Sequence, residues 1–510
     1  MKPLPIGIQS FRKLREGDFL YVDKTEYIHR LLRGSGIYFL SRPRRFGKSL
    51  LLSTLKEVFQ GNRALFSGLW IEDKIDWKPY PVMHLSFDKI SSKSTGTALL
   101  LEEELDAVAS GYGLKLIRTG IKGKTSELIS KLAGDTGVVI LIDEYDKPIL
   151  DAVPDNIELA HSRREVLKEF FETLKSEDAH IRFLLITGIS KFSRMSVFSG
   201  MNNLQDLTLH ERYAAICGYT QEELEAYFAE AFPDIATQQQ LPEPALLPEL
   251  RQWYNGYNWG GDLRVYNPWS ILNLVDKRQI KNYWFSSGHP EFLLRILKKG
   301  LFYQLTDLTV NEILLDSFEL ENIDYRALLF QTGYLTIGTA DPVLHTYTLR
   351  YPNREIEESL LQYMLAAYSE TRIGDTGLTA LHLREALQTG DLDRVVAILN
   401  SLFASIPHQI FLPQYEAYFH SILHIAFTLL GFYVQSEPST AAGRADAVVT
   451  LPDRVYIFEF KINGTAQEAL AQIESRDYAG PYRASGKTVI PVGVGLSVEE
   501  KGISAWMAGA

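Results

Sequence analysis

Short apolar runs alternate with longer segments of helical period over the first 220 residues of the chain. Leucines recur at helical spacing from Leu51 onward, and the segments 98–113 and 164–175 show the same period. Between these segments lie continuous apolar runs of the kind that form buried strands, at 37–40, 82–87, 138–142 and 181–187. The repeated order of strand, helix and strand predicts an α/β fold with a mainly parallel sheet.

Strand signals become sparse between 218 and 404, where amphipathic helical periods dominate. We expect a helical lid and connector there, with the polar segment 236–250 as a loop or linker. Two aromatic stretches, 253–260 and 265–272, interrupt this pattern. Stacked rings with Asn and Gly can form a platform for a base or a sugar, whereas ring packing that clamps the lid to the α/β core needs no ligand. We favour ring packing.

The pattern changes again after residue 405. The predicted elements are, in order, a helix at 415–431, strands at 446–451 and 455–462, a helix at 465–478 and a strand at 488–495. A turn at Pro452 joins the first two strands. This order predicts a small, separate α/β unit.

The chain has 510 residues, 46% of them hydrophobic, which is enough for two or three domains with their own cores. We place the domain limits at 1–217, 218–404 and 405–510. Cys217 is the only cysteine, so no internal disulfide forms, and the N-terminus lacks the apolar segment of a secretory signal. No window approaches the roughly 20 uninterrupted apolar residues of a membrane helix. We therefore expect a cytoplasmic protein without a membrane partner.

The stretch 41–49, SRPRRFGKS, ends like a phosphate-binding loop. In such loops backbone N–H groups at a tight turn and a helix N-terminus point at the phosphates, while Lys and Ser or Thr meet the terminal phosphate and magnesium. Gly47, Lys48 and Ser49 stand where the leucine-rich helix begins. The consensus G-x-x-x-x-G-K-[ST] starts with glycine, where this sequence has Arg42. A basic surface turn is the alternative.

The apolar run at 138–142 ends in two adjacent acids, Asp143 and Glu144. A P-loop ATPase needs an acid at the end of such a strand to hold magnesium, and a Glu to polarise the attacking water. An ordinary solvated strand end is the alternative, but both elements together favour an ATP site. The next strand ends at Thr187, whose hydroxyl could sense the γ-phosphate. Arg194 could act as an arginine finger, although a loop arginine is more often solvated.

These residues lie in longer motif blocks that resemble the predicted AAA-ATPase-like proteins of bacteria, which carry a C-terminal PD-(D/E)XK nuclease-like domain. The blocks cover nearly the whole chain and include PIGIQSF, YVDKTEYI, RPRRFGKS, IDEYDKPI, LITGISKFS, VFSGMNNLQDLT, WYNGYNW, VYNPWSIL and YPNRE. The resemblance implies a P-loop, AAA-like parallel sheet that binds ATP and Mg2+, in which Arg at the first loop position is the rule. The residues expected to bind the nucleotide are Arg42, Arg44, Arg45, Phe46, Gly47, Lys48, Ser49, Leu50, Thr187 and Arg194. Ser49 and Asp143 are expected to hold magnesium, and Glu144 to be catalytic.

Asp446 and the pair Glu459 and Lys461 form a second group of chemical residues. Positions 459 and 461 face the same side of a strand, and the turn at Pro452 brings Asp446 across to them. Two carboxylates and an amine on one face of an apolar sheet are costly unless they bind something. A divalent metal, Mg2+ or Mn2+, would satisfy both acids, while the lysine positions water. A salt-bridged hairpin without catalysis is the alternative.

The order helix, hairpin, helix and strand resembles the restriction-endonuclease-like core of PD-(D/E)XK nucleases. The resemblance assigns the metal to Asp446 and Glu459, and catalytic roles to Asp446, Glu459, Lys461, Glu416 and Gln472. Glu437 competes with Glu416 for the role of the preceding acid.

Charge bears on the nucleic-acid partner that this resemblance implies. The net charge of −11 argues against a protein whose whole surface coats nucleic acid, although a sum does not exclude a basic groove. From residue 405 onward there are seven Lys or Arg and ten Asp or Glu, whereas DNA binding usually needs a basic footprint.

We therefore expect an ATP-dependent machine, able to form a homo-oligomer, that controls a metal-dependent nuclease acting on DNA or RNA. The alternative is an ATP-gated assembly switch or scaffold, in which the carboxylate group is inactive and recognises a partner. Carbohydrate binding through the aromatic stretches is a third interpretation.

Overall fold

The computed structural model describes the chain apart from residues 35, 92–95, 154, 192–196, 199–200, 288–290, 316–319, 321–322, 405–411, 432–434, 439–444 and 510. At 286–287, 412–416 and 435–438 it describes only the backbone. The chain forms two compact units. The first unit comprises Met1–Ser287 and Thr306–Ile356, and the second Gly288–Leu305 and Glu357–Ala510. None of the helices in the described part combines the length and apolar composition of a membrane span.

A five-stranded sheet forms the centre of the first unit. Its strands are β1 (Ile37–Ser41), β2 (Val82–Ser86), β3 (Val138–Asp143), β4 (Ile181–Gly188) and β5 (Gln205–Asp206). They lie in the order β2-β3-β4-β1-β5, and all neighbours are parallel. The predicted α/β fold and its four strands are confirmed. The additional strand β5 is two residues long, too short for a hydrophobic period to reveal it.

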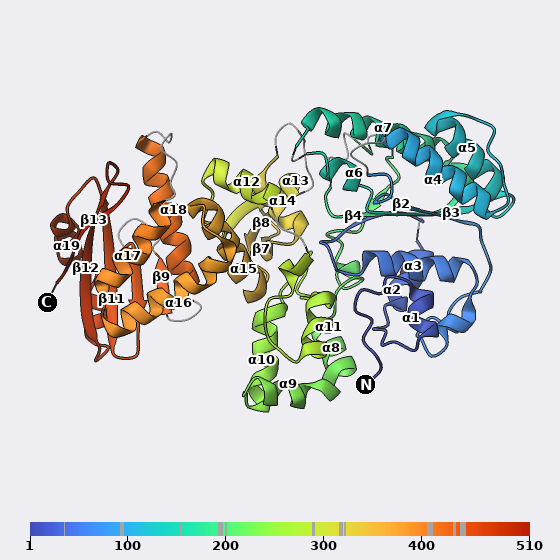
Figure 1. Cartoon of the computed structure of the whole chain (residues 1–510). Coiled ribbons are helices and arrows are strands. Elements are labelled where there is room, and N and C mark those ends of the chain that lie inside the picture. The colour runs from blue at the N-terminus through green and yellow to red at the C-terminus, as the bar shows by residue number, and fades with distance from the viewer. Residues whose placement is uncertain are drawn as a thin grey trace. The chain divides into compact units, whose positions relative to one another are not determined.

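Helices cover both faces of this sheet (Figure 1). On one side lie α4 (Thr97–Gly111), α5 (Gly120–Ala133) and α7 (Ile157–Ser176), and on the other α1 (Phe11–Glu16), α2 (Thr25–Leu32) and α3 (Lys48–Phe59). A short helix, α6 (Lys147–Leu150), follows β3. In α3 the residues Leu51, Leu52 and Leu55 are buried. The apolar side chains whose spacing predicted this helix therefore also anchor it.

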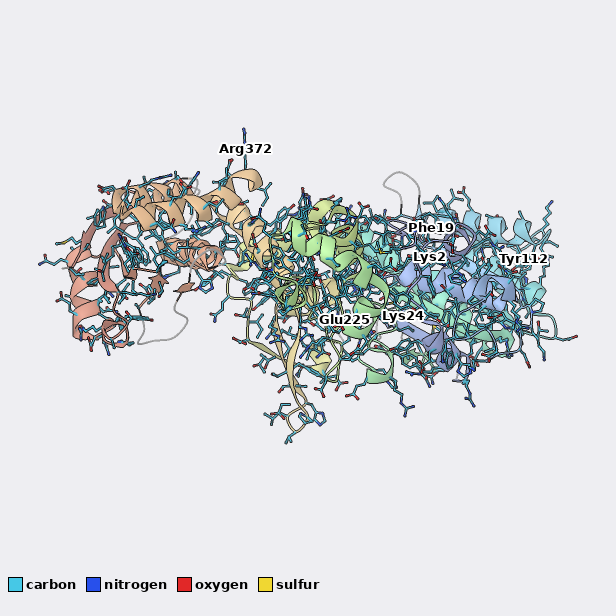
Figure 2. All side chains as sticks on the ribbon, turned by 90° about the horizontal axis from the view of Figure 1, so that it is seen from below. Lys2, Phe19, Lys24, Tyr112, Glu225 and Arg372 are labelled. Atoms are coloured by element: carbon cyan, nitrogen blue, oxygen red, sulfur yellow. The ribbon has the colours of Figure 1, made fainter. Side chains whose placement is uncertain are left out.

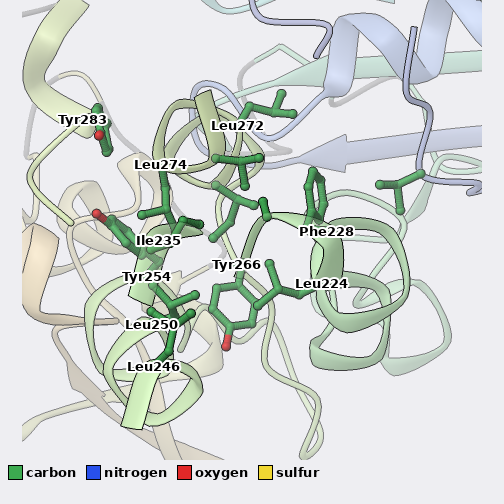
Figure 3. Close-up of a cluster of buried hydrophobic side chains, with 14 of the residues drawn as sticks. Leu224, Phe228, Ile235, Leu246, Leu250, Tyr254, Tyr266, Leu272, Leu274 and Tyr283 are labelled. Carbon is green, nitrogen blue, oxygen red and sulfur yellow. The ribbon is translucent and has the colours of Figure 1, made fainter. Parts of the chain in front are cut away.

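Four further helices of the first unit share one apolar core (Figure 3). They are α8 (Gln221–Phe228), α9 (Phe232–Gln238), α10 (Glu243–Tyr254) and α11 (Pro268–Lys277). Leu224, Leu250 and Leu274 are fully buried in this core. The linker predicted at 236–250 is therefore wrong, because α9 and α10 occupy most of it. Pro244 stands in the first turn of α10, where a missing N–H costs no helical hydrogen bond.

A three-stranded antiparallel sheet completes the first unit. Its strands are β6 (Leu308–Asn311), β7 (Thr336–Asp341) and β8 (Thr346–Arg350), in the order β6-β8-β7, accompanied by α13 (Glu312–Leu315) and α14 (Tyr325–Thr332). The mainly helical segment predicted here omits this sheet, because its strands are rich in threonine and contain no continuous apolar run.

Helices form the first part of the second unit. They are α12 (Glu291–Gly300), α15 (Arg354–Ser369), α16 (Ile373–Thr389), α17 (Leu392–Phe403) and α18 (Leu412–Leu430). The helix α15 begins in the first unit and continues into the second. Arg372, at the turn between α15 and α16, is exposed and points away from the ribbon (Figure 2).

A second five-stranded sheet follows. It contains β9 (Gln435–Pro438), β10 (Ala447–Thr450), β11 (Arg454–Ile462), β12 (Thr488–Ser497) and β13 (Gly502–Ala508), with the helices α19 (Ala466–Ser475) and α20 (Gly480–Arg483). The order is β13-β12-β11-β10-β9, and β11 and β12 are parallel while the other neighbours are antiparallel. The predicted helices and strands are confirmed, with β9 and β13 in addition.

Side-chain alternation along β11 separates two faces of this sheet. Phe458 and Phe460 pack against Phe427 of α18, whereas Ile457 packs with Ile473 of α19. Glu459 therefore lies on the face that α19 covers.

Candidate functional sites

The predicted phosphate loop lies between the carboxyl end of β1 and the N-terminus of α3. Gly47 has a φ of 92° and Arg45 a φ of 66°, so two loop residues adopt a left-handed backbone conformation. Such conformations let successive backbone N–H groups converge on an anion. A Cβ atom at Gly47 would have no heavy atom within 4 Å, so the space beside this residue is open to a ligand.

Lys48 occupies the first position of α3 and is buried. Its Nζ donates to the backbone carbonyls of Arg42 at 2.8 Å and Pro43 at 2.9 Å. Burial lowers the pKa of Lys48, while the nearby acids Asp143 and Asp146 oppose that shift. The ammonium group thus lies inside the loop, held by carbonyl oxygens that phosphate oxygens could replace.

Asp143 and Thr187 meet at the ends of the neighbouring strands β3 and β4. Thr187 Oγ1 donates to Asp143 Oδ1 at 2.8 Å, and the backbone N–H of Glu144 donates to the same oxygen at 3.1 Å. Glu144 is half-buried with a φ of 51°. Burial and the charge of Asp143 raise the pKa of Glu144, which suits a carboxylate that accepts a proton from water.

Three of the remaining residues predicted at this site lie on the loop or in the first turn of α3. Ser49 and Leu50 are half-buried in the first turn of α3, and Arg44 is exposed on the loop. Arg194 lies outside the described residues.

Arg42, which stands where the consensus has glycine, is completely buried. Its guanidinium donates to the carbonyls of Ser41 at 2.8 Å, Thr208 at 2.9 Å and Tyr213 at 3.1 Å. Trp259 covers it, with the ring centroid 4.2 Å away. Burial lowers the pKa of Arg42 to about 10, so the group still carries its charge at neutral pH. The side chain therefore braces the loop internally.

The aromatic stretches pack against the loop itself. The ring of Phe46 lies 4.8 Å from that of Tyr257 and 5.0 Å from that of Trp259. The Arg45 guanidinium stacks 4.0 Å from the ring centroid of Trp269. These contacts confirm the ring-packing interpretation of both stretches.

Asp146 is a buried acid that sequence reasoning left without a role. Its Oδ2 accepts hydrogen bonds from the backbone N–H of Ile189 at 3.0 Å and from the N–H and hydroxyl of Ser190, both at 2.6 Å. Burial raises the pKa of Asp146. The residue ties the segment after Asp143 to the segment after β4. The third acid of the IDEYD block was the only sequence signal for it.

The C-terminal sheet brings together four of the residues predicted there. Asp446 Oδ2 accepts a hydrogen bond from the backbone N–H of Phe460 at 2.8 Å, which holds it across the hairpin. Lys461 Nζ lies 3.5 Å from Glu459 Oε1 and 2.5 Å from Oε1 of Gln472. Gln472, on α19, also donates to Glu459 Oε1. Glu459, Lys461 and Gln472 thus form one hydrogen-bonded group, and Asp446 lies close enough for its charge to act on Glu459.

Glu459 is the most deeply buried member of this group, with 3% of its surface exposed. Within the described residues its Oε2 has no hydrogen-bond partner. Burial and the neighbouring Asp446 raise the pKa of Glu459 to about 7, and burial also raises the pKa of Asp446. Burial thus disfavours the charged forms of both carboxyls, and Glu459 Oε2 lacks a partner among the described residues. A divalent cation bound between them would stabilise both charges.

The sequence predicts one further acid at this site, Glu416 or its competitor Glu437. The described residues contain no group of three or more His, Cys, Asp or Glu side chains suited to a metal ion. The side chains of Glu416, in α18, and Glu437, in β9, lie outside the described part of the chain.

A pocket of about 50 Å³ borders Asp446, the volume of one or two water molecules. His420 and His424 of α18 line it together with Tyr303. Burial lowers the pKa of His424 to about 4, so its imidazole is neutral at physiological pH. Sequence reasoning missed both histidines, because they lie in a helix whose apolar period suggested only packing.

The first unit thus has the parallel sheet and loop of a P-loop nucleotide-binding domain, and the second the mixed sheet and carboxylate–lysine group of a PD-(D/E)XK nuclease-like domain. Comparisons agree: residues 5–198 match the family described as predicted AAA-ATPase, and residues 414–506 match the PD-(D/E)XK nuclease superfamily. Over 517 aligned positions the chain is 39% identical to an uncharacterized protein in the vnfD 5′ region of Azotobacter chroococcum mcd 1, with 98% of each chain covered. The chain belongs to the family of predicted AAA-ATPase-like proteins with a C-terminal PD-(D/E)XK domain. No solved structure matches it.

Proposed function

We propose that the chain binds and hydrolyses ATP at the phosphate loop, and that its nucleotide state controls metal-dependent cleavage of phosphodiester bonds in DNA or RNA. The observation that carries the nuclease half is the buried Glu459 Oε2, which has no hydrogen-bond partner in the described part of the chain, beside Asp446 and Lys461. A buried carboxylate oxygen left in this way is costly unless a ligand satisfies it.

At the ATP site, Lys48 would hold the β- and γ-phosphates once these replace the two carbonyls that it now contacts. Ser49 and Asp143 would hold magnesium, which when bound supplies positive charge against the phosphates. Glu144 would orient and deprotonate water, and Thr187 would hold Asp143 in place. Backbone groups of Arg42, Arg44, Arg45, Phe46, Gly47 and Leu50 would line the phosphates.

At the second site, Asp446 and Glu459 would hold a divalent cation, with Glu416 or Glu437 as a third acid. The cation supplies charge that stabilises the phosphodiester as it is attacked. Lys461 would orient the attacking water, and Gln472 would hold both Lys461 and Glu459 in position through its amide.

We further propose three functional domains, at 1–217, 218–404 and 405–510, a cytoplasmic location and assembly into a homo-oligomer.

One observation favours a second candidate function. Residues 405–510 contain fewer basic than acidic residues, seven against ten. An ATP-gated scaffold, whose second site binds a partner without cutting nucleic acid, is compatible with this acidic excess because it needs no basic surface for nucleic acid.

The test measures ATP turnover and degradation of DNA and RNA by the full chain, with magnesium or manganese. We expect Lys48→Ala to abolish ATP turnover and Lys461→Ala to abolish cleavage. Lys56→Ala, later on α3, and Lys487→Ala, elsewhere in the C-terminal sheet region, are the matched controls. Background activity in the wild type and all variants would contradict the proposal that the chain is an ATPase and nuclease. ATP-dependent assembly without cleavage would favour the ATP-gated scaffold.

A further inference from the structure

Glu355 is a completely buried acid outside both sites. Its Oε1 accepts hydrogen bonds from the backbone N–H of Tyr283 at 2.7 Å and of Trp284 at 3.0 Å. Its Oε2 accepts a hydrogen bond from the hydroxyl of Ser270 at 2.8 Å. An apolar side chain would fill this space without the cost of burying a carboxyl, so the acid itself is the feature to explain.

The segment that Glu355 holds contacts the phosphate loop from its other side. The carbonyls of Tyr283 and Trp284 accept hydrogen bonds from Arg45 Nη1 at 3.2 and 3.3 Å. The ring of Trp284 also meets that of Phe46 edge to face, with centroids 6.4 Å apart. The two adjacent residues Tyr283 and Trp284 thus connect Glu355 to two residues of the loop.

The same segment is tied to the helical core and cannot easily move alone. Tyr283 stacks on Tyr254 at the edge of that core, with ring centroids 6.5 Å apart (Figure 3). Trp269, which covers Arg45, donates its indole N–H to the carbonyl of Tyr283 at 3.2 Å. Arg45 holds a left-handed φ of 66°, a conformation that costs roughly 1–2 kcal/mol without such support.

Glu355 is the second residue of α15, which continues from the first unit into the second. Just before it, Pro352 leaves no space above Gly256, where a Cβ would lie 1.9 Å from the Pro352 carbonyl oxygen. At the other end of α15, the Tyr368 hydroxyl donates to the carbonyls of Leu297 and Phe302, both at 2.8 Å. The start of the helix is therefore fixed in the first unit and its end in the second.

We propose that Glu355 is a positioning residue of the phosphate loop, which holds Tyr283 and Trp284 against Arg45 and passes the occupancy of the loop to α15 and the unit with the carboxylate site. The second half of this inference rests on the proposed ATP-controlled nuclease. The first half needs only that the loop binds ATP.

The experiment measures ATP affinity by calorimetry with magnesium, and nuclease rates with and without ATP, on the full chain. We expect Glu355→Gln to weaken ATP binding about tenfold, because the amide nitrogen cannot accept the hydrogen bond that the Ser270 hydroxyl donates to Oε2. We expect the ratio of nuclease rates with and without ATP to fall towards one. Glu370→Gln, an exposed acid just after α15, is the control and should change neither quantity.

A double variant separates positioning from general destabilisation. If Glu355 acts through Arg45, then Arg45→Ala combined with Glu355→Gln weakens ATP binding no further than Arg45→Ala alone, whereas independent effects would multiply. Ser270→Ala, which removes one of the three hydrogen bonds, should weaken ATP binding by a smaller factor and serves if Glu355→Gln does not fold.

Equal ATP affinity in the wild type and both Glu355→Gln and Ser270→Ala would overturn the positioning role while leaving the ATPase proposal intact. Weaker binding with an unchanged nuclease response to ATP would overturn the link through α15. A wild type that binds no ATP would overturn the proposed function and this inference together.

Discussion

Thr187 donates its hydroxyl to the Asp143 carboxylate across the neighbouring strands β4 and β3 at 2.8 Å. Thr187 is completely buried, and Asp143 lies close enough to Lys48 for its charge to act on that ammonium group. A strand-end threonine and a strand-end aspartate thus form one unit, although 43 residues separate them in the chain.

Replacing Thr187 by Val should lower the free energy of unfolding by about 1–3 kcal/mol, because the hydrogen bond goes to a charged group. It should also lower ATP turnover about tenfold or more, since Asp143 loses its orientation. Denaturant unfolding and turnover assays check both. Thr54→Val, which removes a buried hydroxyl bonded to the Leu50 carbonyl, is the control for stability and should leave more turnover. Equal turnover in the two variants would contradict a role for Thr187 at the site.

Gly47→Ala should abolish ATP binding through its Cβ atom. An alanine at a φ of 92° costs roughly 1–2 kcal/mol of backbone strain, and its Cβ atom fills the open space beside the loop. Gly68→Ala is a matched control, because Gly68 has a φ of 76° and also has no heavy atom near its Cβ position. Both variants should lose similar stability in thermal unfolding, but only Gly47→Ala should lose ATP binding in calorimetry. Equal ATP affinity in both would show that the space beside Gly47 receives no phosphate.

Divalent cations should raise the thermal stability of the wild type. A ligand at 100 times its Kd stabilises a protein by about 2.7 kcal/mol. Glu459→Gln should lose most of this gain, because it removes the buried charge that a cation would neutralise. Glu474→Gln, an exposed acid on α19, should keep it. Melting curves with EDTA, Mg2+ or Mn2+, recorded without nucleotide, provide the measurement, and an identical shift in all three proteins would place the cation elsewhere.

The stability of the wild type should depend on pH through Glu355. Burial raises the pKa of this carboxyl from 4.5 to about 7, so the folded chain binds its proton more tightly than the unfolded chain does. The free energy of unfolding therefore falls as pH rises from about 4.5 to about 7, by about 3 kcal/mol from this group.

Glu355→Gln cannot ionise and should lack this contribution. The free energy of unfolding of the wild type minus that of the variant should decline over the same range and level off above it. Denaturant unfolding of both proteins at several pH values measures this difference. A difference that stays constant with pH would show that Glu355 does not hold a proton in the folded chain.

Local spacing was sufficient to predict both candidate sites. Gly47 and Lys48 follow an apolar run and precede a helical period, so the loop could be placed before any contact was known. The resemblance to PD-(D/E)XK nucleases assigned Gln472, which hydrogen-bonds to both Glu459 and Lys461. Alternation along a strand put Glu459 and Lys461 on one face. These relationships depend on backbone geometry over a few residues, which sequence determines directly.

Long-range partners could not be predicted in this way. Arg42 is predicted at the nucleotide site, and its guanidinium bonds to the carbonyls of Thr208 and Tyr213, 166 and 171 residues away. Glu355 had no assigned role, because its partners Tyr283 and Ser270 lie 72 and 85 residues earlier.

By itself, the sequence determined most elements of the two five-stranded sheets and the positions of both groups of chemical residues, because hydrophobic period and spacing act through local backbone geometry. Only the tertiary structure decided which charged side chains face the open sites and which are buried as braces. That choice depends on which distant carbonyls and rings surround each group, and hence on the packing of the whole unit.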